Sequence, residues 1–196
     1  MSWAGRVSPL VFGGVLREAS RSAAVTNKFT GEEFTRVGLA TREEINEAFD
    51  QAHAATLPMA AMPPHQRVEI LSHLHSLLKQ NANEFAELIS LEAGKPIAGS
   101  KIEVDRSLIT LADGIKEAGS ATPDGTWRDT SSPAGRMSLL SRRFPIGVAS
   151  FVTPFNFPLN LAVGQVRVAS LHANECLDAQ DCSRYRCWMP FRVETI

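Results

Sequence analysis

A short apolar segment bounded by prolines constrains the fold of this chain more than any other feature. Residues 146–152 are apolar or small, include β-branched and aromatic types, and lie between Pro145 and Pro154. Such a run is typical of a strand that is covered on both faces, and strands of this kind belong to α/β sheets. Pro154 and Pro158 remove two backbone donors and end the strand. The sequence therefore predicts an α/β fold.

The loop after this predicted strand presents one asparagine, Asn156, between Phe155 and Phe157. Open parallel sheets bind ligands at the carboxyl ends of their strands, and this loop begins at such an end. Asn156 is therefore a candidate functional residue. The alternative is that its side chain bonds only to its own backbone, as asparagine often does in turns.

Residues 143–161 resemble the NAD(P)-dependent aldehyde dehydrogenases, in which a Pro-x-Gly-Val strand leads into Thr-Pro-(Trp/Phe)-Asn-Phe-Pro. The resemblance extends back through residues 103–106, 88–96, 27–32 and 12–14, and covers about residues 10–163. It implies N-terminal helices and an incomplete Rossmann-like coenzyme-binding domain over residues 1–163, with a protruding hairpin at about 121–143. It also implies NAD or NADP as the cofactor and a small aldehyde as the substrate.

The resemblance implies a role for each residue of the loop. In the family, a cysteine thiolate attacks the aldehyde, and fixed N–H donors stabilise the negative oxygen of the adduct. The side-chain amide of Asn156 is the catalytic donor by this resemblance. Val152, Thr153, Pro154 and Phe155 would line the nicotinamide-ribose side of the cofactor groove.

Two functions follow for this chain. Family members are more than twice its length, and their catalytic Cys, general-base Glu, cofactor-binding Lys and Gly-rich turn lie downstream of the Asn. We locate none of these in the sequence. The family reaction converts aldehyde, NAD(P)⁺ and water to carboxylic acid, and we expect this chain to be inactive alone. The alternative is a non-catalytic fragment that acts only by association with full-length subunits.

After Val163 the sequence departs from the family pattern, so we expect the resemblance to end there and residues 164–196 to form an aberrant, poorly ordered tail. A frameshifted or mis-spliced end is the simplest explanation. Cys176, Cys182 and Cys187 all lie in this tail. Cys176 follows Asn156 too closely to be the family nucleophile, and the cysteine spacing matches no usual zinc site. We therefore predict unstructured thiols and no metal.

Composition excludes several classes of function. The chain has 196 residues, of which 44% are hydrophobic, enough for one sizeable domain. Lys and Arg total 20 against 21 Asp and Glu, for a net charge of −1, which gives no basic excess for nucleic acid. No apolar run is long enough to span a membrane, and residues 1–17 lack the apolar core of a secretory signal. We expect a cytoplasmic protein.

Local patterns predict the remaining elements. We expect short strands over residues 11–37 with a turn at 29–32, and a first helix with Thr41 and Glu44 as its capping box. Residues 58–64 should interrupt the chain, and a second helix should open at Pro64. A third helix is expected at 83–92 and a fourth at 97–117. The stretch 93–96 ends the third helix as a C-cap and is not a phosphate-binding loop.

Turn signals at 123–125 and 132–135 flank two short segments, 126–130 and 137–143, which predict a hairpin. An exposed hairpin is only marginally stable in water, so we expect a partner. In the resembling family this hairpin pairs with a neighbouring subunit, which implies a homo-oligomer. The alternative is that the hairpin covers the sheet of its own chain.

Overall fold

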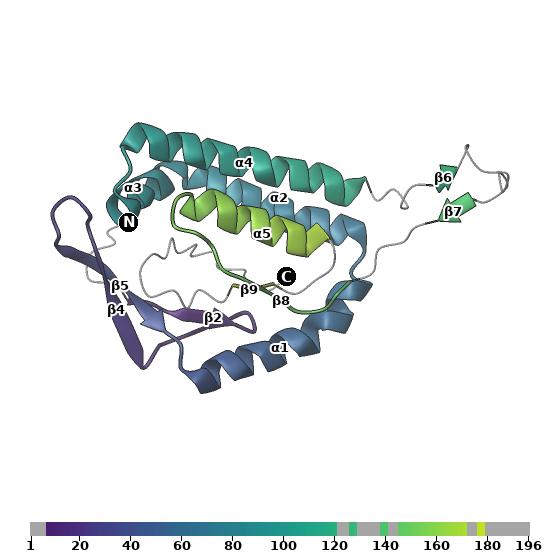
Figure 1. The fold of residues 1–196 in the computed structure, drawn as a ribbon, viewed down its shortest axis with the longest axis horizontal. Helices are drawn as coiled ribbons and strands as arrows, with labels where there is room; N and C mark the ends of the chain where they lie inside the picture. Colours follow the sequence, from purple (N-terminus) through teal and green to yellow (C-terminus); the bar gives the residue numbers. More distant parts are fainter. Residues whose placement is uncertain (1–6, 121–125, 129–137, 141–144, 172–175, 179–196) are drawn as a thin grey trace.

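The computed structural model describes residues 7–120, 126–128, 138–140, 145–171 and 176–178. Four helices pack together along one side of the molecule, while the N-terminal strands and the remaining helix, α1, lie on the other side (Figure 1). The described part is a mixture of helices and small sheets, which confirms the predicted α/β class. The strands are β1 (Val7–Ser8), β2 (Leu10–Phe12), β3 (Val15–Arg17), β4 (Arg21–Thr26), β5 (Glu33–Leu39), β6 (Thr126–Arg128), β7 (Ser138–Leu140), β8 (Ala149–Phe151) and β9 (Cys176–Asp178). The helices are α1 (Arg42–Ala61), α2 (Pro64–Gln80), α3 (Ala82–Ala93), α4 (Ile97–Gly119) and α5 (Pro158–Leu171).

The N-terminal strands form two small sheets. β5 lies between β1, which runs parallel to it, and β4, which runs antiparallel, while β2 and β3 form a separate hairpin. Asn27 Oδ1 accepts a hydrogen bond of 2.9 Å from the N–H of Phe29, and Gly31 has a φ of 76°. These are the features of a turn that needs an asparagine and a glycine. The predicted turn at 29–32 is therefore confirmed.

Helix α1 begins as predicted and ends later than predicted. Glu44 N–H donates to Thr41 Oγ1 at 3.2 Å, and Thr41 N–H donates to Glu44 Oε2 at 2.7 Å, so both bonds of the capping box form. The predicted interruption within 58–64 is confirmed at residues 62–63, but it does not begin at Pro58, because the helix continues through this proline to Ala61. A proline inside a helix removes one hydrogen bond and crowds the preceding turn, and α1 retains it. The actual end is Met62, whose φ and ψ are −63° and 123°.

Helices α2, α3, α4 and α5 enclose the core. The buried apolar cluster consists of residues from all four: Leu71, Leu78, Phe85, Ala86, Ile89, Val104, Leu111, Ala118, Leu159 and Val163. Pro64 occupies the first turn of α2, and Gly94 ends α3 with a left-handed φ of 70°. The second, third and fourth helices and the C-cap at 93–96 are thus confirmed, with ends that differ from the predictions by at most two residues.

Strand β8 is shorter and more exposed than the sequence predicts. Only Ala149–Phe151 is extended and paired, and the described residues give it one neighbour, β9, in parallel register. Gly147 has a φ of 93°, a conformation that a strand does not accommodate, which explains the late start. Ile146 is 82% exposed and Val152 66%, so the prediction of a strand over 146–152 covered on both faces is wrong.

Helix α5 crosses the position where we expected the resemblance to end. It runs from Pro158 to Leu171, and Ala169 is buried at 3% exposure. Cys176 lies in β9, opposite Ala149 of β8, so its backbone is part of a strand and the prediction of an unstructured thiol is wrong for this cysteine. Cys182 and Cys187 lie outside the described residues. The division into a domain over 1–163 and a tail over 164–196 stays a prediction.

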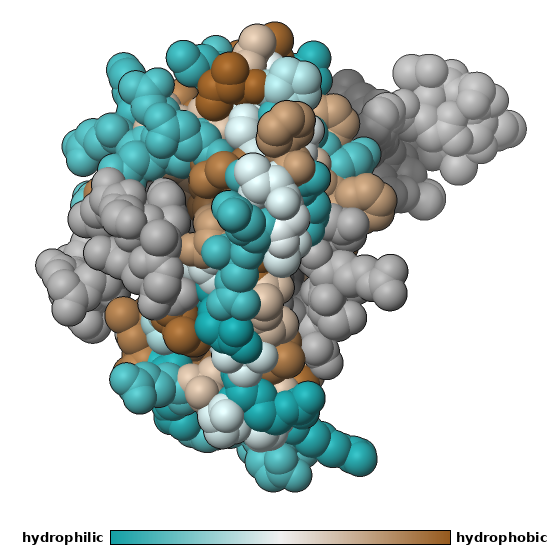
Figure 2. Space-filling model, turned by 90° about the vertical axis from the view of Figure 1, so that its left-hand side faces the viewer, coloured by the Kyte–Doolittle hydropathy of each residue, from teal (hydrophilic) through white to brown (hydrophobic). Residues whose placement is uncertain are grey.

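Strands β6 and β7 pair in antiparallel register, with Thr126 opposite Leu140 and Arg128 opposite Ser138. This pairing confirms the predicted hairpin, although its turn lies outside the described residues. The pair projects beyond the end of the helical layer (Figure 1). On the face shown in Figure 2, hydrophobic side chains reach the surface in several patches separated by hydrophilic ones. Across the part of the chain that the structure describes, no helix is long and apolar enough to cross a membrane.

Candidate active site

Asn156 lies in the turn that joins the carboxyl end of β8 to the first residue of α5. Its side chain is exposed, and within the described residues it has no hydrogen-bond partner. The structure therefore does not support the alternative in which this side chain bonds only to its own turn. Val152, Pro154 and Phe155 are also exposed, and Thr153 is half-buried. The five predicted site residues thus form one continuous segment at the strand's carboxyl end.

Two contacts hold this segment against α5. The Thr153 hydroxyl donates a hydrogen bond of 2.8 Å to Gln165 Oε1, which ties the start of the loop to the middle of the helix. At the other end, Leu161 N–H donates to the carbonyl oxygen of Phe157 at 3.1 Å and closes the first turn of α5. The loop is therefore fixed on both sides of Asn156.

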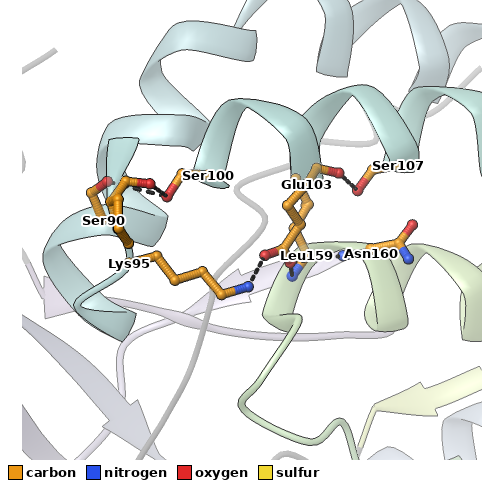
Figure 3. A network of polar contacts seen from close by, with 8 residues as sticks. Ser90, Lys95, Ser100, Glu103, Ser107, Leu159 and Asn160 are labelled. Carbon is orange, nitrogen blue, oxygen red and sulfur yellow. Dashed lines mark hydrogen bonds and ion pairs between the residues drawn. The ribbon is translucent and has the colours of Figure 1, made fainter. Parts of the chain in front are cut away.

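A buried carboxylate on α4 caps the first turn of α5 (Figure 3). Glu103 is only 1% exposed, and its Oε1 accepts hydrogen bonds from the backbone N–H groups of Leu159 at 3.0 Å and Asn160 at 3.3 Å. The first N–H groups of a helix have no intrahelical partner, and a negative charge there is favoured by the helix dipole. Hydrogen bonds to a charged group contribute about 1.5–3 kcal/mol each. Glu103 thus joins α4 to the helix that follows Asn156.

The second oxygen of Glu103 accepts from an ammonium group. Lys95, between α3 and α4, points toward Glu103 and donates to its Oε2 (Figure 3). The Lys95 side chain is 22% exposed, and its Nζ also lies 4.1 Å from the centre of the Phe157 ring, a cation–π contact. Lys95 therefore contacts both the buried carboxylate and the residue next to Asn156.

Sequence reasoning did not identify Lys95 and Glu103 as parts of the site. Both belong to segments that carry the resemblance, 88–96 and 103–106, but their contact with the loop depends on the packing of α4 against α5. One signal was present: a glutamate among the apolar residues on the buried side of a helix usually has a partner. Ser107, one turn later on the same face, donates only to the carbonyl oxygen of Glu103 at 2.9 Å.

The arrangement can supply a neutral N–H donor and an apolar wall. An exposed carboxamide on a fixed loop can donate to a developing alkoxide with little reorganisation, which is the requirement for stabilising such a charge. The exposed side chains of Val152 and Phe155 provide apolar surface beside it, of the kind that lines ligand sites. The described residues contain no group of three or more metal-ligating side chains.

The resolved pKa shifts lie away from this loop, where β3 contacts α1. Arg17 donates two hydrogen bonds, of 2.9 and 2.7 Å, to the carboxylate of Glu47. These bonds, more than any other influence, hold the pKa of Glu47 below its ordinary value and raise the pKa of Arg17. The pair joins β3 to α1.

Comparison with known proteins identifies the class. The model of the aldehyde dehydrogenase family matches residues 15–177. A lactaldehyde dehydrogenase of Methanocaldococcus jannaschii is 32% identical over 153 residues, and a 3-sulfolactaldehyde dehydrogenase of Priestia aryabhattai is 30% identical over 152. These alignments cover 76% and 78% of this chain but only 31% of each relative. The chain therefore belongs to the aldehyde dehydrogenase family and spans about a third of the length of the curated relatives it matches.

Solved structures agree with this assignment. Aldehyde dehydrogenase 21 of Physcomitrella patens, in complex with succinate, superposes with a TM-score of 0.79 at 29% identity, covering 87% of this chain and 36% of that one. A glyceraldehyde-3-phosphate dehydrogenase of Methanocaldococcus jannaschii complexed with NADP gives 0.71 at 29% identity, covering 80% and 33%. The family match extends to residue 177, beyond residue 163, where we expected the resemblance to end.

Proposed function

We propose that this chain provides the oxyanion donor and one wall of the cofactor groove of an oxidoreductase that converts an aldehyde, NAD(P)⁺ and water to a carboxylic acid. The proposal rests on the position of Asn156. Its side chain is exposed at the carboxyl end of β8, on a loop that hydrogen bonds fix at both ends. The family match over residues 15–177 supports it, because that match includes the whole loop.

In this proposal the side-chain N–H of Asn156 donates to the aldehyde oxygen as a thiolate adds to the carbonyl carbon. The negative charge that develops on this oxygen is then stabilised by a donor whose position is already fixed. Removal of one such donor costs about a hundred- to a thousand-fold in rate. The nucleophile and the general base belong to the part of the family fold that the matched third does not include.

Val152, Thr153, Pro154 and Phe155 would hold the nicotinamide-ribose part of NAD or NADP, which accepts the hydride when it is bound. Relatives with solved structures support both cofactors, since one is complexed with NADP and a methylmalonate-semialdehyde dehydrogenase of Sinorhizobium meliloti with NAD. The hydroxyl of Thr153 already donates to Gln165, so this residue contributes its methyl group and its backbone to the groove.

We further propose that residues 1–196 alone do not oxidise aldehydes. Oxyanion stabilisation does not replace a missing nucleophile. The test is NADH or NADPH formation at 340 nm with several small aldehydes, using the purified 196-residue chain and a variant with Cys→Ser changes at positions 176, 182 and 187. We expect no turnover from either protein. Turnover that survives all three changes would contradict the assignment of this chain as one part of the catalytic site.

The second candidate function is association with full-length subunits, as a cytoplasmic protein without activity of its own. The projecting pair β6–β7 favours it, because an isolated two-stranded hairpin is marginally stable in water and gains from a partner. Size-exclusion chromatography tests this, with the chain, with and without residues 121–143, run alone and mixed with the full-length lactaldehyde dehydrogenase of Methanocaldococcus jannaschii. Co-elution that disappears with the deletion supports association through the hairpin, a larger species of the chain alone supports a homo-oligomer, and the absence of both species would contradict this function.

A further inference from the structure

The first turn of α5 lacks the side-chain cap that a helix usually has. Pro158 is its first residue and has no N–H, and Phe157 before it carries no hydrogen-bonding side chain. The first available N–H groups, on Leu159 and Asn160, both donate to Glu103 of the neighbouring helix. Glu103, a residue of α4, therefore caps the first turn of α5 in place of a local side chain. Asn156, which could otherwise fold back onto these groups, keeps its carboxamide exposed.

Lys95 and Glu103 together contact the chain immediately after Asn156. Lys95 Nζ lies over the ring of Phe157, the next residue, while Glu103 holds the N–H groups of the third and fourth residues after Asn156. Both oxygens of Glu103 are used, one for α5 and one for Lys95. Because both of its oxygens accept hydrogen bonds, the Glu103 carboxylate is held in one orientation. The first turn of α5, which donates to it, is held in place as well.

An ion pair with one buried partner, as here, is weak evidence of a stabilising role, because desolvation offsets most of its attraction and apolar replacements are often as stable. We propose that Lys95 and Glu103 are a positioning pair that fixes the direction in which the Asn156 carboxamide points. This inference rests on the proposed function of Asn156. Neither residue touches the reacting atoms; each acts through the loop and the first turn of α5.

The test uses the ¹⁵N-labelled 196-residue chain without any ligand. Two readouts are needed: amide hydrogen exchange at Leu159 and Asn160, and the backbone order parameters of Asn156 and Phe157. Glu103→Gln removes the charge and weakens the cap, so exchange at the two amides should rise about tenfold or more. Lys95→Met keeps the bonds from Glu103 Oε1 to α5, removes the partner of Oε2 and releases the ring of Phe157. It should lower the order parameters at 156 and 157 from about 0.85 toward 0.6, while the two amides lose less protection than in Glu103→Gln.

Two controls separate positioning from a general loss of stability. Ser107→Ala removes a buried hydroxyl from the same face of α4 that bonds only to its own helix, and should change neither readout. Lys95→Arg keeps a cation at Phe157 and near Glu103, and should restore the order parameters that Lys95→Met lowers. Unchanged order parameters in a folded Lys95→Met protein, or an equal loss in Ser107→Ala, would overturn the proposal.

The result is independent of whether Asn156 takes part in catalysis. A loop that loosens in Lys95→Met supports the positioning pair even if Asn156→Ala leaves the rate of an active enzyme unchanged, in which case the proposed function alone fails. A loop that stays ordered in Lys95→Met refutes the positioning pair and leaves the role of Asn156 intact.

Discussion

The packing of α4 against α5 sets the position of the candidate loop. At Gly114 of α4 there is no room for a side chain, because Arg167 of α5 lies against it. A Cβ atom at Gly114 would lie 2.4 Å from Cγ and 2.8 Å from Cδ of Arg167 on α5. Carbon atoms prefer about 3.5–4.0 Å, so Gly114→Ala forces either α5 or the Arg167 side chain to move. Movement of Arg167 also disturbs its ion pair with Glu117, whose atoms are 3.7 Å apart.

The expected cost follows from two opposing terms. Overpacking of a core contact costs about 1–3 kcal/mol, while alanine in place of glycine within a helix contributes about 0.5–1 kcal/mol of stability. The matched control is Gly164→Ala in α5, because a Cβ there meets no described atom within 4 Å and should gain only the helical term. The two variants should therefore differ by about 1–3 kcal/mol.

Thermal and urea unfolding followed by circular dichroism measure this difference. For a protein of this size, each kcal/mol shifts Tm by about 2–4 °C, so Gly164→Ala should melt about 2–12 °C above Gly114→Ala. Equal Tm values for the two variants would refute the close approach of Arg167 to α4, and with it the packing that places Glu103 beside the first turn of α5.

Three further predictions concern other parts of the molecule. Thr41→Ala should lower the free energy of unfolding by about 0.5–2 kcal/mol in urea titrations, whereas Thr41→Ser, which keeps the capping hydroxyl, should stay close to the parent. The pKa of Glu47 is lower in the folded than in the unfolded chain, so the contribution of the Arg17–Glu47 pair is complete above the ordinary glutamate pKa and lost as the pH falls through the folded value. Arg17→Met should therefore reduce Tm at pH 7 more than at pH 3, and an equal reduction at both would contradict the pair. Finally, the exposed apolar residues that flank β8 should make the chain self-associate when expressed alone. A monomer in analytical ultracentrifugation that also unfolds in one cooperative thermal transition would count against this.

Local signals in the sequence predicted most of the helices and turns. The Thr41–Glu44 box, Pro64 at the start of α2 and Gly94 at the end of α3 act within a few residues, and each behaves as its chemistry requires. Pro58 is the exception. It lies inside α1, although a proline in a helix interior removes one hydrogen bond and crowds the preceding turn.

Contacts between distant segments were less predictable. The pairing of β8 with β9 and the continuation of α5 beyond Val163 depend on how residues up to 178 pack, and the motifs that carried the resemblance all lie before Val163. The candidate loop itself was identified from sequence, since its prolines and asparagine are adjacent. Lys95 and Glu103 were not, because they meet the loop only through the packing of α4 on α5.

The most direct test of the central claim measures the rate of an enzyme in which Asn156 faces a nucleophile. Residues 15–177 of this chain would replace the matched third of the lactaldehyde dehydrogenase of Methanocaldococcus jannaschii, and kcat and KM would be measured at 340 nm. Asn156→Ala should lower kcat by about a hundred- to a thousand-fold with little change in KM, while Asn160→Ala, whose side chain accepts a hydrogen bond from Thr110 within the helical layer, should keep most of the activity. A kcat for Asn156→Ala within about tenfold of the parent would contradict the role of its carboxamide as the oxyanion donor.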